Sequence, residues 1–172
     1  MVHIKKNKTA IWVITPNGTK LAEMLSRDLT ESDVYISRKI APTQIGHLRF
    51  ENLSEALNQK FKRYSGHIFI MSTGIVVRVI APLINNKVED PAVVVVDDQA
   101  NHAISLLSGH LGGANALTQK VANIIGAGPV ITTATDVNRL PAIDVLAKEM
   151  DLLIENPGAI KTVNMALLKG EK

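Results

Sequence analysis

The sequence contains no cysteine, which excludes disulfide bonds and thiolate metal sites. Its five histidines are scattered, and no two have the HxH or HExxH spacing typical of metal ligands. No apolar run reaches the length that a membrane span needs, and no small-residue cleavage site follows the basic start. We therefore expect a cytoplasmic protein with no membrane partner and no metal site of its own.

Aromatic residues are also scarce, at 3% of the chain, and none follows Phe69. Because proteins that bind single-stranded nucleic acid stack bases on aromatic side chains, this scarcity argues against a nucleic-acid partner. The net charge of +3 is unevenly distributed: residues 1–66 hold eleven Lys or Arg against six Asp or Glu, and residues 67–172 hold eight against ten. Such a mildly basic surface also suits a small ligand with several negative charges.

Apolar residues are plentiful, at 46% of 172 residues, which is enough for one packed core. Residues 10–74 alternate between β-rich runs and helical spacings, so they predict the order strand, helix, strand, helix, strand, with a turn at Pro16–Gly18 after the first strand. That order indicates parallel strands with helices on the faces of the sheet. The three strands are expected at Ala10–Thr15, Asp33–Ser37 and Gly66–Gly74.

The run Ile75–Ile84 is apolar apart from Arg78, and periodicity alone does not separate helix from strand there. We expect a helix, because a crossover is needed before the next parallel strand at Ala92–Asp98. His102–Leu107 follows after a short turn, which predicts an antiparallel hairpin. The predicted fold class is α/β: a three-layer αβα sandwich with a mainly parallel sheet and one antiparallel hairpin.

The remaining elements are one strand and three helices, and Gly126 is expected to cap the first helix at its carboxyl end. The strand is expected at Pro129–Asp136 and the helices at Ala114–Ile125, Ala142–Met150 and Gly158–Gly170. We divide the chain into an α/β domain over residues 1–138 and a helical extension over residues 139–172.

Four predicted strands end in small polar residues. Ligands of open α/β sheets bind beyond the carboxyl ends of the strands, so these endings would rim one crevice if the strands lie side by side and parallel. The same residue types also serve as ordinary helix caps and turns, and this alternative stays open. The four endings are Thr15–Gly18, Ser72–Gly74, Ser108–His110 and Thr132–Asp136.

The segment SGHLGGAN joins the hairpin strand to the next helix. Its three glycines permit positive φ and close backbone approach, and the helix after them offers N–H groups and the positive end of its dipole. We expect a carboxylate or phosphate to bind there. The glycines lack the GxGxxG spacing and no GxxxxGK[ST] motif is present, which argues against a nucleotide.

His110 lies in this segment and is the candidate proton carrier, although a structural role is the common alternative for a single loop histidine. Ser108 precedes it by two residues and suggests a nucleophile, but the GxSxG motif is absent. Asp97, Asp98 and Asp136 are candidate orienting carboxylates and equally common turn residues.

Several segments, in this order, resemble the cobalt-precorrin-5A hydrolase family of anaerobic cobalamin (vitamin B12) biosynthesis. They are STGIVVRVIAPLI, DPAVVVVDD, ISLLSGHLGGAN and PVITTATD. The resemblance runs from His67 to Asp144, about half of the chain. No single segment is decisive, and the order and spacing of all four make the resemblance specific.

The resemblance implies a cobalt-bearing, partly methylated tetrapyrrole substrate with acetate and propionate arms and a δ-lactone that joins ring A to the meso carbon. Enzymes of this family open the lactone and release acetaldehyde while the ring contracts toward corrin. Because cobalt arrives with the substrate, no further cofactor is expected.

In that reaction His110, oriented by Asp97 or Asp136, is expected to activate water or move the proton, with Ser108 beside it. The residues expected to bind the carboxylates and oxygen atoms of the substrate are Ser72, Thr73, Gly74, Arg78, Lys87, Gly109, Gly112, Gly113, Asn115, Thr133 and Thr135.

Family members usually continue through a variable central region into a second domain, whereas this sequence ends at Lys172. A carboxy-terminal domain or a second copy of the chain is therefore an expected partner. Two alternatives to a self-sufficient hydrolase stay open: a corrinoid-binding domain that needs a partner for catalysis, and a nucleotide-binding α/β domain.

Overall fold

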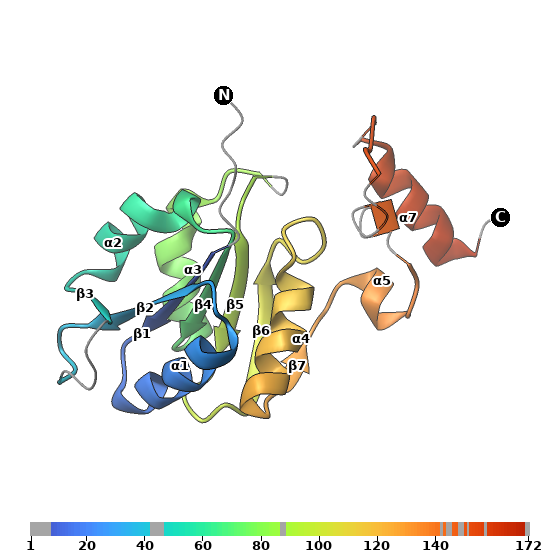
Figure 1. The fold of residues 1–172 in the computed structure, drawn as a ribbon. Helices are drawn as coiled ribbons and strands as arrows, with labels where there is room; N and C mark the ends of the chain where they lie inside the picture. Colours follow the sequence, from blue (N-terminus) through green and yellow to red (C-terminus); the bar gives the residue numbers. More distant parts are fainter. Residues whose placement is uncertain are drawn as a thin grey trace.

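A seven-stranded sheet forms the centre of the protein in the computed structural model (Figure 1). The structure describes residues 8–41, 47–86, 89–141, 143, 146–147, 150, 152–156 and 158–170. The strands are β1 Thr9–Val13, β2 Ser32–Ser37, β3 Leu48–Phe50, β4 Gly66–Ile70, β5 Ala92–Val96, β6 His102–Leu107 and β7 Gly128–Val130.

Helices cover both faces of the sheet, which gives three layers (Figure 1). α1 and α4 pack on one face, and α2 and α3 pack on the other. The predicted three-layer α/β sandwich is confirmed. The helices are α1 Pro16–Asp28, α2 Leu53–Lys60, α3 Thr73–Ile80, α4 Ala114–Ile125, α5 Ala134–Val137 and α7 Ala159–Lys169, and short 3-10 turns follow α2 at Phe61–Arg63 and α3 at Ala81–Leu83.

The strand order is β3-β2-β1-β4-β5-β6-β7, and every neighbouring pair is parallel except β5–β6. Residues 97–101 between β5 and β6 are too few for a crossover, so these two strands form the predicted antiparallel hairpin. β7 is parallel to β6, and both therefore run opposite to the other five strands.

Alternation of side chains along β1 divides the core into two clusters. Ile11 and Val13 pack beneath α1 and α4, whereas Ala10 and Trp12 pack beneath α2 and α3. All four residues are fully buried. Complete burial of both faces is expected for a central parallel strand that helices cover on each side.

His67 packs against the aromatic rings of Trp12, Phe61 and Phe69 in the second cluster and is fully buried. Nε1 of Trp12 donates to Nδ1 of His67 over 3.0 Å. The Nε2–H group of His67 donates to the carbonyl oxygen of Phe61 over 2.9 Å. Burial lowers the pKa of His67 to about 4, although the hydrogen bond to Phe61 acts in the opposite direction. The imidazole is therefore neutral at physiological pH and serves as a structural link within the core.

The structure differs from the predicted elements in several places. The strand predicted at Gly66–Gly74 ends at Ile70, because α3 begins at Thr73. The predicted turn at Pro16–Gly18 is instead the first turn of α1, because proline is tolerated at N1 and Oγ1 of Thr15 caps the helix by accepting from Gly18 N–H. The short strand β3 was not predicted, since three residues carry too little periodicity. The strand predicted at Pro129–Asp136 ends at Val130, and α5 follows it.

The apolar run at Ile75–Ile84 is confirmed as helical, because α3 and the 3-10 turn after it span most of it. Gly126 caps α4 with φ 72°, as predicted. The helix predicted at Ala142–Met150 lies largely outside the described residues, whereas the one at Gly158–Gly170 is observed as α7. Among the helices that the structure describes, none combines the length and hydrophobicity that crossing a bilayer requires.

The buried neutral His67 predicts that acid destabilises the fold. Below about pH 6.5 the unfolded chain binds a proton at this residue, whereas the folded chain does not until about pH 4. The free energy of unfolding should therefore fall by about 3 kcal/mol as the pH decreases through this window. Urea titrations of wild type and His67→Gln between pH 7 and pH 4 measure the free energy of unfolding. The variant should lose this pH dependence.

The matched control is His102→Gln, which removes a histidine whose side chain is 62% exposed. It should keep the pH dependence of the wild type. An unchanged slope in His67→Gln would contradict the prediction.

Candidate functional site

The reversal at the β5–β6 hairpin separates the four polar strand endings into two groups. β1 and β4 end at one edge of the sheet, here called the Thr15 edge, which also holds Ser72. β6 and β7 end at the opposite edge, here called the His110 edge, which also holds Ser108 and Thr132. The expectation of a single crevice rimmed by all four endings is wrong, because it required all four strands to be parallel.

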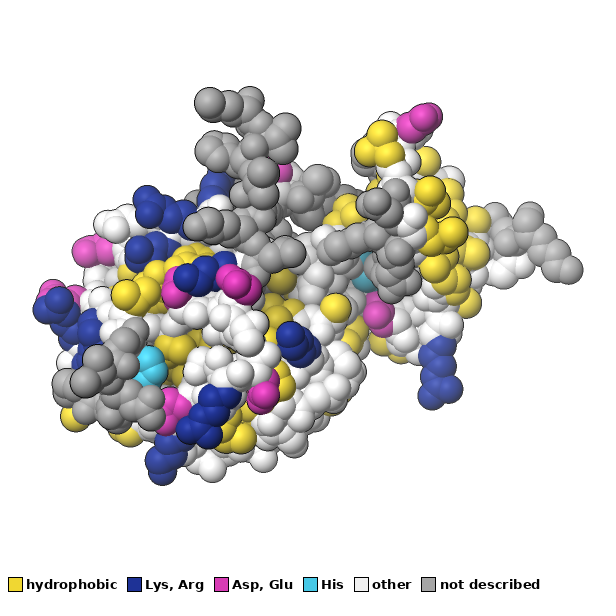
Figure 2. Space-filling view, in the orientation of Figure 1, with side chains coloured by type: hydrophobic (Ala, Val, Ile, Leu, Met, Phe, Trp, Pro, Cys, Tyr) yellow, Lys and Arg dark blue, Asp and Glu magenta, His cyan; other side chains and the backbone are white. Residues whose placement is uncertain are grey.

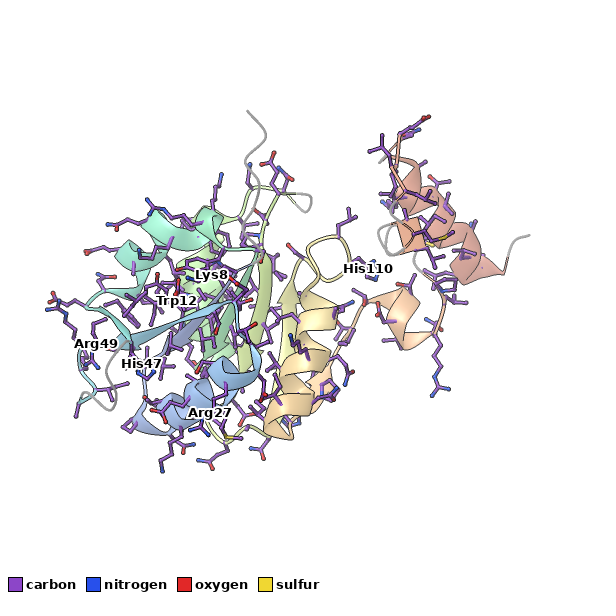
Figure 3. All side chains as sticks on the ribbon, in the orientation of Figure 1. Lys8, Trp12, Arg27, His47, Arg49 and His110 are labelled. Carbon is purple, nitrogen blue, oxygen red and sulfur yellow. The ribbon has the colours of Figure 1, made fainter. Side chains whose placement is uncertain are left out.

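His110 and Asp136 form a hydrogen-bonded pair at the His110 edge. His110 projects from the loop after β6 toward α5 and α7 (Figure 3). Its Nε2 lies 2.8 Å from Oδ2 of Asp136 and 3.0 Å from Oγ1 of Thr135. The side chains of His110 and Asp136 are 20% and 38% exposed, so both are partly shielded and still reachable.

Asn115, in the first turn of α4, connects this pair to the sheet. Its side-chain Nδ2 donates to Oγ1 of Thr133 over 2.8 Å and to Oδ2 of Asp136 over 3.1 Å. Its Oδ1 accepts from Oγ of Ser105 in β6 over 2.6 Å. Only 8% of Asn115 is exposed, and its amide is engaged within the protein. Asn115, expected to bind substrate, is instead placed to hold Asp136.

Asp136 is an ionised carboxylate at neutral pH. Partial burial acts to raise its pKa, but hydrogen bonds from Thr133, His110 and Asn115 together with the charge of His110 outweigh burial and hold the pKa below its ordinary value. Oγ1 of Thr133 is the shortest of these donors, at 2.5 Å from Oδ2. A fixed carboxylate of this kind orients the imidazole.

Two of the three glycines in the loop are required by close packing. A Cβ at Gly109 would lie 2.9 Å from Oδ1 of Asn115, and a Cβ at Gly112 would lie 2.2 Å from Cβ of Ser108. Gly113 adopts φ 84°, a left-handed conformation that side chains disfavour. These glycines therefore allow the loop to pack closely, with Gly109 against Asn115 of α4.

The first amides of α4 are used by the loop itself. Ala114 N–H donates to the carbonyl of Ser108 and Asn115 N–H donates to the carbonyl of Gly109, both over 3.0 Å. The expectation that the N–H groups at this helix start hold a substrate anion is therefore wrong for these two amides. These two N–H groups hold the loop closed and are not available to a ligand.

Ser108 adopts φ 60°, which is uncommon for a residue with a side chain. Its Oγ is buried and, within the described part of the chain, makes no hydrogen bond. A nucleophile must reach its substrate, so this conformation does not present Ser108 for attack. The structure places its hydroxyl within the packed loop.

Asp97 lies at the Thr15 edge and does not orient His110. Its carboxylate accepts hydrogen bonds from three backbone N–H groups of the turn that follows, at 2.6 to 3.2 Å. Partial burial acts to raise the pKa of Asp97, but these hydrogen bonds outweigh burial and hold the pKa below its ordinary value. Of the two carboxylates expected to orient His110, Asp136 is the one that the structure brings to it.

The other predicted binding residues divide between the two edges. Thr133 and Thr135 lie beside His110, whereas Ser72, Thr73 and Gly74 begin α3 at the Thr15 edge. Arg78 lies exposed on α3, and Lys87 lies outside the described residues. The structure does not bring Ser72, Thr73, Gly74 or Arg78 to the His110 edge.

A cavity of about 400 Å³ opens beside the His110–Asp136 pair. One wall consists of residues 108–111 and 133–135, and the other wall is α7. Apolar side chains gather on the α7 side of the molecule (Figure 2). Within the described residues, no group of three or more His, Asp or Glu side chains is placed to hold a metal ion. The residues that α7 contributes to the cavity are Ile160, Lys161, Asn164, Met165 and Leu168.

The fold and the site define an α/β protein with a hydrogen-bonded His–Asp pair beside a cavity at one sheet edge. Residues 55–136 match the family model "Cobalamin synthesis G N-terminal", and residues 141–172 match "Cobalamin biosynthesis central region". The chain belongs to this cobalamin synthesis G family.

Named relatives agree with this assignment. The chain is 44% identical over 171 residues to the cobalt-precorrin-5A hydrolase of Salmonella typhimurium, covering 98% of this chain and 48% of the relative. It is 38% identical over 167 residues to the cobalt-precorrin-5A hydrolase of Priestia megaterium, covering 95% and 45%. The chain therefore spans about half the length of these curated relatives.

A solved structure shows the same fold. The crystal structure of a cobalamin biosynthesis protein G homolog from Sulfolobus solfataricus superposes with a TM-score of 0.55 at 27% identity, covering 95% of this chain and 46% of that one.

The hydrogen bonds of Asn115 predict that Asn115→Leu raises the pKa of Asp136 toward its ordinary value, because one donor to the carboxylate is lost. The variant should also lose about 1–3 kcal/mol of stability, since polar groups of Ser105 and Thr133 lose their partner. Carbon-detected NMR titration of the Asp136 carboxyl and urea unfolding measure the two effects.

Asn123→Leu on the exposed side of α4 is the matched control and should change neither quantity. An Asp136 titration that stays as in wild type when Asn115 is replaced would contradict this role for the buried amide.

Proposed function

We propose that this chain carries the proton-transfer site of a cobalt-precorrin-5A hydrolase, which opens the ring A δ-lactone and releases acetaldehyde during corrin ring contraction in anaerobic cobalamin biosynthesis. The printed names of two relatives, at 44% and 38% identity, support the substrate. The observation that carries the proposal is the His110–Asp136 pair beside the cavity.

The reaction needs a group that takes a proton from water and returns it to the oxygen that leaves the acyl carbon. Water adds across the acyl–oxygen bond, so one product group is a carboxylate and the other is the hydroxyl on the meso carbon. The hydroxyl then loses its proton and becomes the aldehyde carbonyl as the carbon–carbon bond between that carbon and the macrocycle breaks. The electron pair of this bond stays on the macrocycle, the carbon leaves with its methyl group as acetaldehyde, and the reaction consumes no oxidant or reductant. His110 carries the proton in this scheme, and Asp136 orients the ring and stabilises the imidazolium.

The floor of the site comes from α5 and the residue before it. Oγ1 of Thr135 lies within hydrogen-bond distance of Nε2 of His110, and Thr133 and Thr135 both line the cavity. Thr135 is only 3% exposed, so it shapes the floor beside the imidazole. Thr133 is committed to Asp136 and acts with Asn115 in holding the carboxylate.

The cavity is at the small end of the range of about 300–1,000 Å³ for small-molecule sites. We propose that this cavity accepts one edge of a tetrapyrrole, that the lactone edge enters, and that a further domain covers the rest of the macrocycle. The share of the relatives that this chain does not span supports a further domain for that role. We place the reaction in the cytoplasm, with cobalt brought by the substrate.

The experiment that tests the function incubates the purified chain with cobalt-precorrin-5A, follows the mass of the tetrapyrrole and traps acetaldehyde. We expect ring-opened product and acetaldehyde from wild type. His110→Ala should lower kcat at least 100-fold, because general acid–base catalysis contributes about 10²–10⁴-fold. Its affinity for the substrate should change by less than threefold.

His102→Ala is the control, since His102 is exposed at the hairpin turn on the Thr15 edge. It should hydrolyse at the wild-type rate. Loss of binding in His110→Ala with turnover unchanged at saturation would show that His110 only grips the ligand, which is the role of a corrinoid-binding domain. Binding without turnover by wild type would assign catalysis to the partner domain.

A further inference from the structure

We infer that Lys161 of α7 binds a carboxylate of the substrate across the cavity from His110. The inference depends on the proposed function for the identity of the ligand and on the cavity for its geometry. Lys161 lies outside the sequence motifs and outside the segments that carry the family resemblance.

The charge of the cavity walls favours an anion. Among the described residues that line the cavity, Lys161 is the only Lys or Arg, and none is Asp or Glu. His110, on the opposite wall, carries a positive charge when it holds the catalytic proton. A ligand that brings negative charge therefore meets Lys161 on one wall. On the other wall it meets the His110–Asp136 pair, whose charges balance when His110 is protonated, so Lys161 supplies the net positive charge.

Lys161 occupies the first turn of α7, where a cation does not serve the stability of the helix. The N-terminal end of a helix is the positive end of its dipole, so lysine there is unfavourable, and this first turn holds no acidic residue to offset it. The lysine and the helix dipole add to the same positive potential on this wall of the cavity.

The position of Lys161 is fixed by its neighbours in α7. Ile160 is 7% exposed, and Oδ1 of Asn164 accepts a hydrogen bond from Ile143 N–H over 3.0 Å. The hydrogen bond ties α7 to the chain at Ile143, and α7 also contacts α5. In this placement Lys161 lines the cavity. Met165 and Leu168 make the rest of this wall apolar, which suits the rim of a macrocycle next to a charged arm.

A carboxylate arm held at Lys161 and a lactone placed at His110 orient the ring by two points. Two contacts hold the substrate in one orientation, whereas contact with His110 alone would leave the substrate free to rotate. Lysine holds a carboxylate as a point charge, without the paired geometry that arginine imposes. Lys161 is thereby a substrate-binding residue that determines specificity for acidic tetrapyrroles.

The test measures binding, by the visible absorbance of the cobalt-tetrapyrrole, in a His110→Ala background so that the ligand stays intact. The ligands are cobalt-precorrin-5A and the same compound after methyl esterification of its carboxylates. Lys161→Met should weaken binding of the acid about tenfold in 50 mM salt, and the difference should shrink in 500 mM salt because ions screen exposed charges. Lys161→Arg should stay within threefold of the background protein.

Lys120→Met, an equal charge change on the exposed surface of α4, is the control and should bind as the background protein does. The methyl ester should bind Lys161→Met and the background protein equally. Unchanged affinity for the acid in Lys161→Met, an equal loss for the ester, or no binding to the background protein would each overturn the inference. Hydrolysis is not measured, so a chain that binds through Lys161 but releases no acetaldehyde contradicts the proposed function alone.

Discussion

The antiparallel turn between β5 and β6 determines where everything else in the site lies. Asp97 holds that turn by accepting three backbone hydrogen bonds, and Ala100 within it adopts φ 57°. Because the chain reverses there, β6 and β7 deliver their carboxyl ends to the edge where the parallel strands begin. A crossover at this point would have put His110 at the same edge as Thr15. Asp97 thus shapes the site from the far end of the sheet without touching it.

Once the strands are reversed, a single buried amide joins the elements at the His110 edge. Asn115 reaches Ser105 in β6, Thr133 after β7 and Asp136 in α5, so strand, helix and loop share one set of hydrogen bonds. Gly109 is packed against the same amide, and a side chain there would displace it. Because buried polar groups are costly when unpaired, the network has one stable arrangement, and that arrangement keeps Asp136 ionised and facing His110.

The sequence could predict the layers, the crossover helix α3 and the hairpin, because each depends on local periodicity and on connection length. It could also predict the pairing of His110 with Asp136 as one of two choices. It could not predict that the polar strand endings divide between two edges, although the hairpin already implied it. The role of Asn115 was missed for another reason. The resemblance placed it among the substrate-binding residues, and spacing along the chain does not show that its amide is buried between Ser105 and Asp136.

The cavity lies between the two parts of the chain that match different family regions. His110 and Asp136 belong to the amino-terminal match, whereas the opposite wall, α7, belongs to the central-region match. Neither part encloses the cavity alone, since residues 108–111 and 133–135 form one wall only. Under the proposed function, this arrangement gives a physical reason for the two regions to occur together. One region supplies His110 as the proposed proton carrier, and the other supplies the apolar surface and the lysine proposed to place the substrate against it. The helical extension is therefore a part of the site.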